Sequence, residues 1–358
     1  YDSGDYPAAL EKALAAIGGV EAFRRRQSEA QRQGRHLGLG IGCYIEGTGV
    51  GPFEGATIRI DPSGKIYVAS GACPQGQGME TVFAQIAADA WQVAPDDVIV
   101  ALADSDAIAM GFGTIASRST VTLSAAIYEA SAKLREKVFA IAANMLECAP
   151  ADLELRDGGV GIVGVPGAAV TLAKIVAAAR PGWDHSRPPG VAAGLEETHY
   201  WEPPTVTWSY AVHVAIVAVD AELGRVSVEQ YAVAHDCGTV VNPLLLDGQV
   251  AGGTAQGLGG ILLEELAYDD AGQLLTGSLM DYLLPTASDM PHIAMVHLTA
   301  PSPLNPLGVK GVGEGGAVAP PAAIANAVRD ALAAIGAEVN ATPITSQRVL
   351  AAIRRARP

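Results

Sequence analysis

Four short, glycine-rich loops carry most of the side chains in this sequence whose types and spacing could do chemistry. The first loop, residues 71–81, places two glutamine amides, Gln75 and Gln77, on either side of Gly76. A primary amide both donates and accepts hydrogen bonds, and a glycine lets a ligand approach the backbone because it has no Cβ. The loop could therefore bind a polar ligand, and it also fits an ordinary turn from strand to helix.

The second loop, residues 111–120, ends directly before a long predicted helix. It contains Ser117, Arg118 and Ser119, followed by Thr120. Hydroxyl groups and an arginine at a helix start form an anion site, because the first amides of a helix lack partners within it. Serine and threonine also serve as ordinary helix caps, so both interpretations stay open.

The third loop, residues 235–243, begins with His235, Asp236 and Cys237 in succession. These three residue types suggest zinc, but neighbours in an extended chain point to opposite faces and cannot converge on one metal. The loop is therefore predicted to bind a polar ligand and not a metal.

The fourth loop, residues 310–316, contains Gly311, Gly313 and Gly316 in the spacing G-x-G-x-x-G. This spacing is the dinucleotide fingerprint, which belongs after the first strand of a βαβ unit. A proline-rich segment precedes the loop here, and residues 317–358 are all that follow. A nicotinamide-dependent dehydrogenase is therefore an alternative that rests on this one motif.

Glu314 is the acid within the fourth loop, set among small and apolar neighbours. Burial there would raise its pKa toward the range useful to a general base. The alternative is a solvated turn glutamate stabilised by the following helix.

The elements that must position these loops alternate between strands and helices, which predicts an α+β fold. The predicted helices cover residues 7–35 (interrupted at 18–19), 80–93, 121–146, 171–180, 246–265 and 319–335. The predicted strands cover residues 38–46, 55–60, 65–70, 98–103, 153–163 (a hairpin), 205–219 and 225–234. Residues 181–204 are predicted to be a long irregular segment.

Composition excludes several classes of protein. The chain has 358 residues, 49% of them hydrophobic, with 41 Gly and 22 Pro, so we expect a globular protein with many tight turns and no helical bundle. The net charge is −15 and basic residues are scattered, which excludes nucleic acid as a partner. No apolar run has the 18 to 20 residues, roughly, that a membrane span needs, so we expect a soluble protein. The sparse cysteines fit a reducing compartment, so we expect it in the cytoplasm.

The four cysteines, at positions 43, 73, 148 and 237, show no C-x-x-C pair. Iron–sulfur and structural zinc sites on this chain are therefore not expected. Tyr1 in place of Met suggests that the chain is trimmed or part of a longer product.

In their order and approximate spacing, the four loops resemble the xanthine oxidase family of molybdenum hydroxylases. The matching motifs are Gln75-Gly76-Gln77-Gly78, Ala116-Ser117-Arg118-Ser119-Thr120, Asp236-Cys237-Gly238-Thr239 with Asn242-Pro243, and Lys310-Gly311-Val312-Gly313-Glu314. The resemblance is to the C-terminal half of the family's large molybdopterin-binding subunit. It implies a molybdopterin-binding domain of the aldehyde oxidase/xanthine dehydrogenase type, with two α/β subdomains and glycine-rich loops at helix starts.

On this resemblance, residues 1–36 form a helical entry arm, 37–180 a first molybdopterin-binding subdomain and 181–358 a second one that carries the loop of Glu314. The implied cofactor is molybdopterin with molybdenum, held through the pterin and not by protein ligands, and in bacteria often the molybdopterin cytosine dinucleotide. Implied cofactor-binding residues are Gln75, Gly76, Gln77, Ala116, Ser117, Arg118, Ser119, Thr120, Asp236, Cys237, Thr239, Asn242, Lys310, Gly311, Val312 and Gly313.

Glu314 matches the family's catalytic glutamate, which would take the proton from a molybdenum-bound hydroxyl group. Gln77 would lie near an apical molybdenum oxygen, and Ile115 and Ala116 near the substrate. The implied reaction inserts water-derived oxygen at an electron-poor carbon of an N-heterocycle or an aldehyde.

Electrons would leave through a 2Fe-2S cluster and FAD on partner subunits, because this chain has no cysteine cluster. A complementary polypeptide would supply the N-terminal half of the molybdenum subunit, and the heteromeric unit would form a dimer. Two alternatives stay open: a carbon monoxide dehydrogenase-type molybdenum subunit, and a non-catalytic cofactor carrier or scaffold.

Overall fold

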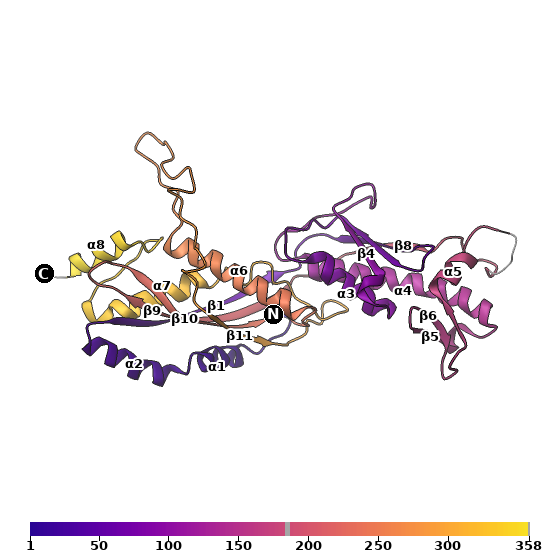
Figure 1. Ribbon diagram of the computed structural model, residues 1–358, viewed down its shortest axis with the longest axis horizontal. Coiled ribbons are helices and arrows are strands. Elements are labelled where there is room, and N and C mark those ends of the chain that lie inside the picture. The colour runs from indigo at the N-terminus through magenta and orange to yellow at the C-terminus, as the bar shows by residue number, and fades with distance from the viewer. Residues whose placement is uncertain (183–186, 357–358) are drawn as a thin grey trace. The chain divides into compact units, whose positions relative to one another are not determined.

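The computed structural model describes residues 1–182 and 187–356 and confirms an α+β architecture (Figure 1). The chain divides into two compact units. Unit 1 comprises residues 1–48, 208–302 and 310–358, and unit 2 comprises residues 49–207 and 303–309. The first and second loops belong to unit 2, and the third and fourth loops to unit 1.

Unit 1 is built on a four-stranded sheet with helices on both faces. The strand order is β1 (His36–Thr48), β9 (Thr207–Val219), β10 (Val226–Asp236) and β11 (Ile293–Leu298). Strands β9 and β10 pair antiparallel, as the predicted hairpin requires, and β10 and β11 pair parallel.

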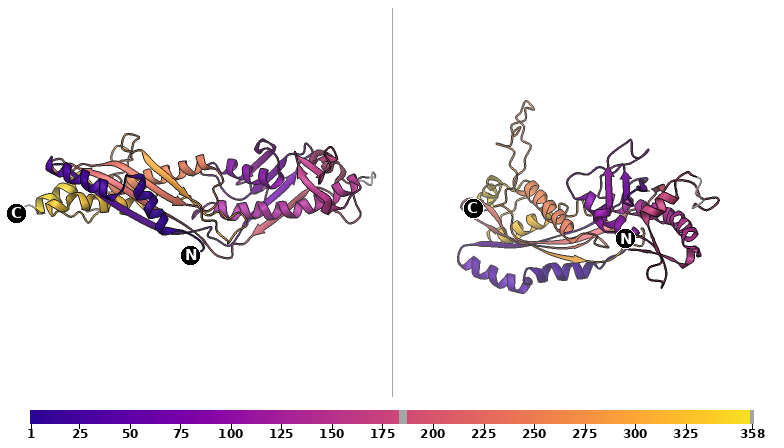
Figure 2. Two further views of the ribbon diagram at one scale, coloured as in Figure 1. Left: turned by 90° about the horizontal axis from the view of Figure 1, so that it is seen from below. Right: turned by 45° about the vertical axis from the view of Figure 1, so that its right-hand side comes forward.

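Two helical layers cover the two faces of this sheet. On one face lie α1 (Tyr6–Ala16) and α2 (Val20–Arg32), which Figure 2 shows along the strands. On the other face lie α6 (Pro243–Leu262), α7 (Pro320–Leu332, continued by a 3₁₀ turn, Ala333–Ile335) and α8 (Ser346–Ala356). Alternate residues of β9 point into the two layers, so that Val212 and Val214 pack with α1 and α2 while Ala215 and Val217 pack with α6 to α8.

Helix α7 lies directly on the backbone of β1. A Cβ atom on Gly38 or Gly40 would overlap the backbone oxygens of Ala327 and Ala323, and one on Gly42 would lie 2.6 Å from the oxygen of Ala319. These three glycines alternate along the strand and therefore share the face that α7 covers. Any side chain there would push the helix away from the sheet.

Unit 2 contains a second four-stranded sheet, in the order β4 (Val98–Leu102), β3 (Ile66–Ser70), β2 (Glu54–Ile60) and β8 (Glu196–Trp201). The 28-residue helix α4 (Ser119–Leu146) packs on one face, beside α3 (Met79–Trp91). A small sheet follows, formed by β5 (Leu153–Arg156), β6 (Gly159–Ile162) and β7 (Ala169–Thr171), with α5 (Leu172–Ala178). Short 3₁₀ turns at Pro95–Asp97 and Pro150–Asp152 precede β4 and β5.

The structure differs from the sequence-based expectation in four elements. Strand β8 lies within residues 181–204, which were predicted to be irregular, and 183–186 of that segment fall outside the described residues. Strands β7 and β11 and helix α8 were not predicted. The two compact units have other bounds than the expected subdomains, which divide the chain after residues 36 and 180 and stay a prediction.

Within the part of the chain that the structure describes, every helix is too short or too polar to span a lipid bilayer.

We expect Gly40→Ala to lower the free energy of unfolding by about 3 kcal/mol, because the added methyl group overlaps the backbone of α7. Urea unfolding followed by circular dichroism measures the change. Gly252→Ala is the matched control, since that glycine lies within α6 and no neighbouring atom lies within 4 Å of its Cβ position. The control should be neutral or stabilising by about 1 kcal/mol, and equal effects of the two substitutions would contradict the prediction.

Candidate functional site

The first and second loops lie side by side in unit 2. The backbones of Gly71 and Gly111 approach so closely that a Cβ on Gly71 would lie 2.5 Å from the Cα of Gly111. Thr114 links the loops, since its Oγ1 accepts a hydrogen bond from the Cys73 amide at 3.0 Å and its backbone oxygen accepts one from Gln75 Nε2 at 3.2 Å. The structure therefore brings together two motifs that are about 40 residues apart in sequence.

The two glutamines of the first loop differ in their exposure. Gln75 is exposed, whereas Gln77 is half-buried and accepts a hydrogen bond from the Gln75 amide through Oε1 at 2.6 Å. Between them, Gly76 has a φ of 95°, and no atom lies within 4 Å of its Cβ position. The carbonyl end of the Gln77 side chain is therefore fixed, and its NH2 group is a donor beside an open stretch of backbone at Gly76.

The second loop ends in an unusual backbone conformation. Ala116 and Ser117 both have positive φ values, 45° and 50°, directly before α4. Left-handed conformations of non-glycine residues are uncommon and cluster at functional sites, where surrounding contacts impose them. Here Ser119 supports the turn, since its hydroxyl donates to Thr114 Oγ1 at 2.9 Å.

Arg118 does not extend toward a ligand as the anion-site interpretation requires. Its side chain is fully buried and forms an ion pair with the equally buried Glu54 at 2.7 Å. The guanidinium also donates to the backbone oxygens of Val50, Phe53 and Gly113 at 2.6 to 2.7 Å. Four donor contacts to the protein show that this cation holds the second loop in place, and cofactor contact by Arg118 stays a prediction.

The third and fourth loops are joined in unit 1 by a second buried ion pair. Lys310 Nζ lies 2.9 Å from Asp236 Oδ1, and both side chains are fully buried. Asp236 also accepts hydrogen bonds from the amides of Gly238 and Ala300, at 3.1 and 2.7 Å. Lys310 donates through its backbone amide to the Cys237 oxygen at 2.8 Å. These two predicted cofactor ligands therefore bind each other and fix the two loops.

The remaining polar side chains of the third loop differ in burial and in their contacts. Cys237 is buried, and burial raises the pKa of its thiol to about 12, so the thiol stays protonated and unreactive. Asn242 caps α6, since its Oδ1 accepts from the Leu245 amide at 3.0 Å. Thr239 is exposed and available to a ligand. No group of three or more His, Cys, Asp or Glu residues in the described chain is placed to hold a metal.

The fourth loop presents Glu314 on a tightly seated backbone. The Gly311 amide donates to Thr48 Oγ1 at 2.9 Å. A Cβ on Gly315 would lie 2.7 Å from Tyr44 Oη and 2.8 Å from His235 Nε2, so only glycine fits there. Glu314 itself is exposed in this chain, which is the position of the solvated turn glutamate and not of the buried one. The flanking glycines have no side chains that could cover it.

A polar cluster lies beneath this loop within the apolar core of unit 1. Tyr44 Oη, His213 Nε2 and both ring nitrogens of His235 are buried without a hydrogen-bond partner in the described chain. His213 Nδ1 contacts Tyr231 Oη at 3.0 Å. Burial lowers the pKa of His213 and of His235 to about 3, so both imidazoles are neutral near neutral pH.

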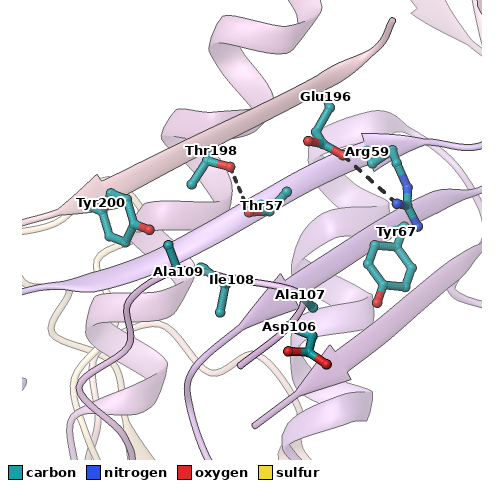
Figure 3. Close-up of a pocket in the computed structure, with 10 residues that line it drawn as sticks. All are labelled: Thr57, Arg59, Tyr67, Asp106, Ala107, Ile108, Ala109, Glu196, Thr198 and Tyr200. Atoms are coloured by element: carbon teal, nitrogen blue, oxygen red, sulfur yellow. Dashed lines mark hydrogen bonds and ion pairs between the residues drawn. The ribbon is translucent and has the colours of Figure 1, made fainter. Parts of the chain in front are cut away.

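A pocket of about 500 Å³ lies on the sheet of unit 2 (Figure 3). Arg59, stacked on Tyr67, approaches Glu196 to 4.0 Å, and Thr57 hydrogen-bonds to Thr198 at 2.7 Å. Alternation along β2 places these side chains opposite the face that packs on α4. None of the predicted site residues lines this pocket, so it is separate from the candidate site.

Comparison with known proteins identifies the class to which this arrangement belongs. The family model described as the molybdopterin cofactor-binding domain matches residues 13–291. The chain therefore belongs to this family, which confirms its resemblance to the large subunits of xanthine oxidase-type molybdenum hydroxylases.

Individual relatives match over almost the whole chain. The chain is 36% identical to the nicotine 6-hydroxylase large subunit of Paenarthrobacter nicotinovorans, over 99% of its own length and 45% of that protein. It is 35% identical to the carbon monoxide dehydrogenase large chain of Afipia carboxidovorans, over 94% and 43%. The crystal structure of quinoline 2-oxidoreductase from Pseudomonas putida 86 superimposes with a TM-score of 0.92 and 40% identity, over 99% and 46%. The chain thus spans about half the length of these relatives.

The G-x-G-x-x-G motif does not lie in the structural context that a nicotinamide-dependent dehydrogenase requires. The G-x-G-x-x-G motif lies between β11 and α7, and turns separate it from the end of β11 at Leu298. A dinucleotide fingerprint instead connects a strand directly to a helix within a parallel sheet.

We expect Arg118→Met to lower the free energy of unfolding by about 3 to 5 kcal/mol, because it leaves Glu54 as an unpaired buried charge. Urea unfolding measures the loss of free energy. In the double variant, adding Glu54→Gln should restore most of the lost free energy of unfolding. Arg32→Met is the control, since Arg32 and Glu29 form an exposed pair whose removal should cost less than about 1 kcal/mol. A loss no larger than that of the control would contradict a buried role for Arg118.

We also expect stability to fall as the pH drops from about 6.5 toward 3. The unfolded chain protonates His213 and His235 near the ordinary histidine pKa, whereas the folded chain does so only near pKa 3. Each histidine then contributes a slope of about 1.4 kcal/mol per pH unit between these values, and none above them. His235→Gln should reduce the slope by that amount in urea unfolding at pH 6.5, 5.5 and 4.5. An unchanged slope would show that His235 is not buried in its neutral form.

Proposed function

We propose that this chain is part of the catalytic molybdenum subunit of a hydroxylase that oxidises an aromatic N-heterocycle. The observation that carries the proposal is the match of almost the whole chain to such large subunits. Two of these relatives are named for nicotine and quinoline, which are both N-heterocycles. The aldehyde oxidoreductase of Desulfovibrio gigas is 23% identical and supports the fold alone.

The loops fit the cofactor that the family implies. Molybdopterin and its dinucleotide form are anionic, and this chain, with a net charge of −15, has both loop cations already paired internally. The donors that remain are neutral: backbone amides at helix starts, glutamine amides and hydroxyl groups. Amides at helix N-termini bind phosphate well without any cationic side chain.

The proposed roles of the predicted residues fall into two groups. Those proposed to contact the cofactor are Gln75, Gly76, Gln77, Ala116, Ser117, Ser119, Thr120, Thr239, Gly311, Val312 and Gly313. Those proposed to hold the loops in place are Arg118, Asp236, Cys237, Asn242 and Lys310. Gln77 is proposed to face the metal end of the cofactor, because its carbonyl end is already fixed by the Gln75 amide.

Glu314 is proposed as the general base. When bound, the molybdenum cofactor supplies water activation and takes up two electrons from the substrate. The Glu314 carboxylate accepts the proton that this activation releases. The close contact of Gly315 with Tyr44 and His235 fixes the backbone of the loop next to Glu314. A base on a fixed loop needs no reorganisation when the proton moves.

The proposed assembly follows from the relatives. The nicotine relative is a large subunit, and another is subunit gamma of a dehydrogenase complex. We propose partner polypeptides that carry the remaining half of the molybdenum subunit, a 2Fe-2S cluster and FAD, in a dimer of the heteromeric unit located in the cytoplasm.

The decisive test compares Glu314→Gln with wild type in the native complex, purified with its co-expressed partners. We expect turnover of an N-heterocycle to fall by at least about a thousandfold while molybdenum per complex is unchanged, because the amide cannot accept the proton. Glu222→Gln, an exposed glutamate in the turn between β9 and β10, is the matched control and should retain full turnover.

The other outcomes point to different functions. Full turnover in Glu314→Gln would overturn its role as the base. Molybdenum without turnover of any heterocycle or aldehyde, but with oxidation of carbon monoxide, would favour the carbon monoxide dehydrogenase type. Cofactor binding without any turnover would indicate a carrier. A molybdenum-free complex that reduces a nicotinamide nucleotide would overturn the whole proposal.

A further inference from the structure

Residues 263–291, between α6 and β11, form an arm that projects from unit 1 (Figure 1). The arm is held in shape by its own hydrogen bonds. The Leu275 amide donates to the Ala267 oxygen at 2.8 Å and the Asp269 amide to the Gln273 oxygen at 3.0 Å, around a bridge between Tyr268 and Leu274. An ordered arm loses little conformational freedom when it binds a partner.

The arm carries an unusual amount of exposed apolar surface. Seven of the 21 exposed large hydrophobic residues in the described chain lie within its 29 positions, each 50% to 86% exposed: Leu266, Tyr268, Leu275, Leu279, Met280, Leu283 and Leu284. Concentrated apolar surface of this kind marks an interaction site on a folded protein. Leu279 and Met280 are the most exposed of the seven.

The charge of the arm narrows the choice of partner. It contains six acidic residues, at 264, 265, 269, 270, 281 and 289, and no lysine or arginine; Glu265 pairs with Arg348, which leaves the arm acidic. The same acidic arm on a second copy of this chain would repel it, and so would an anionic lipid surface. The partner surface that fits is an apolar groove with a basic rim.

The length of the relatives indicates where such a surface lies. The chain matches 45% of the nicotine 6-hydroxylase large subunit and 46% of quinoline 2-oxidoreductase, so more than half of each lies outside the match. We propose that the arm docks into an apolar, basic-rimmed groove on the polypeptide that corresponds to that unmatched part. This inference rests on the proposed function, which requires the same polypeptide.

Site-specific photo-crosslinking tests the proposal directly. The full chain, carrying p-benzoylphenylalanine in place of Met280, is co-expressed with the complementary polypeptide of the same organism, irradiated and analysed by mass spectrometry. We expect a crosslink to that polypeptide from position 280 and none from the control position, Leu223, which is 65% exposed in the turn between β9 and β10. A crosslink to a second copy of this chain or to the iron–sulfur or FAD subunit, or none, would overturn the proposal.

A binding measurement supplies the second test. The double variant Leu279→Ser/Met280→Ser should weaken the Kd for the complementary polypeptide by about tenfold or more, because central apolar anchors carry most of the binding energy. The control, Leu223→Ser/Val163→Ser, alters two other exposed apolar residues and should keep the wild-type Kd. Matching circular dichroism spectra and Tm values show that all variants fold.

Molybdenum content separates the two proposals. A molybdenum-containing complex that binds its complementary polypeptide equally well with and without the arm substitutions overturns the arm proposal and leaves the proposed function intact. A chain that retains no molybdenum and binds no complementary polypeptide overturns both.

Discussion

The close approach of α7 to β1 is the contact on which the rest of unit 1 depends. Alternate glycines at positions 38, 40 and 42 let the helix backbone lie directly on the strand. The fourth loop leads into this helix, and Gly316 packs against Gly253 of α6 in the same way, backbone against backbone. Glu314 therefore lies on a loop that is held at two places, and both places are contacts between backbones: α7 on β1, and Gly316 on α6. Such contacts allow less adjustment than side-chain packing, because no rotamer can change to accommodate a shift.

In each unit a fully buried ion pair joins a loop to its framework. Buried pairs add little net stability, because desolvation offsets their attraction, but breaking one is costly. Their effect is therefore on position: they exclude alternative loop arrangements that would leave a buried charge without a partner. Arg118 fixes the second loop on β2 through Glu54, and Lys310 fixes the fourth loop on the end of β10 through Asp236.

The sequence predicted those helices and strands that a pattern of neighbouring residues indicates. It also predicted that the four glycine-rich loops act together. Hydrophobic periodicity and glycine breaks indicated α4, the two helices before β1 and the β9–β10 hairpin. Strand β8 was missed because Glu196–Trp201 is polar and follows a long irregular stretch, so its pairing with β2 is not visible locally. The structural roles of Arg118 and Lys310 were missed for a related reason. Each partner lies 64 or 74 residues away, and a charged residue type does not reveal whether it faces a ligand or another side chain.

The internal pairing of Arg118 and Lys310 has a consequence for the way an anion would be retained. Attraction between a ligand and exposed cations weakens as dissolved ions screen it, over a Debye length of about 8 Å at physiological ionic strength. Donors that are peptide dipoles in fixed loops release no condensed counterions and depend instead on geometry. A cofactor held by such donors should survive high-salt chromatography, and mild denaturants that loosen the loops should release it well before salt does.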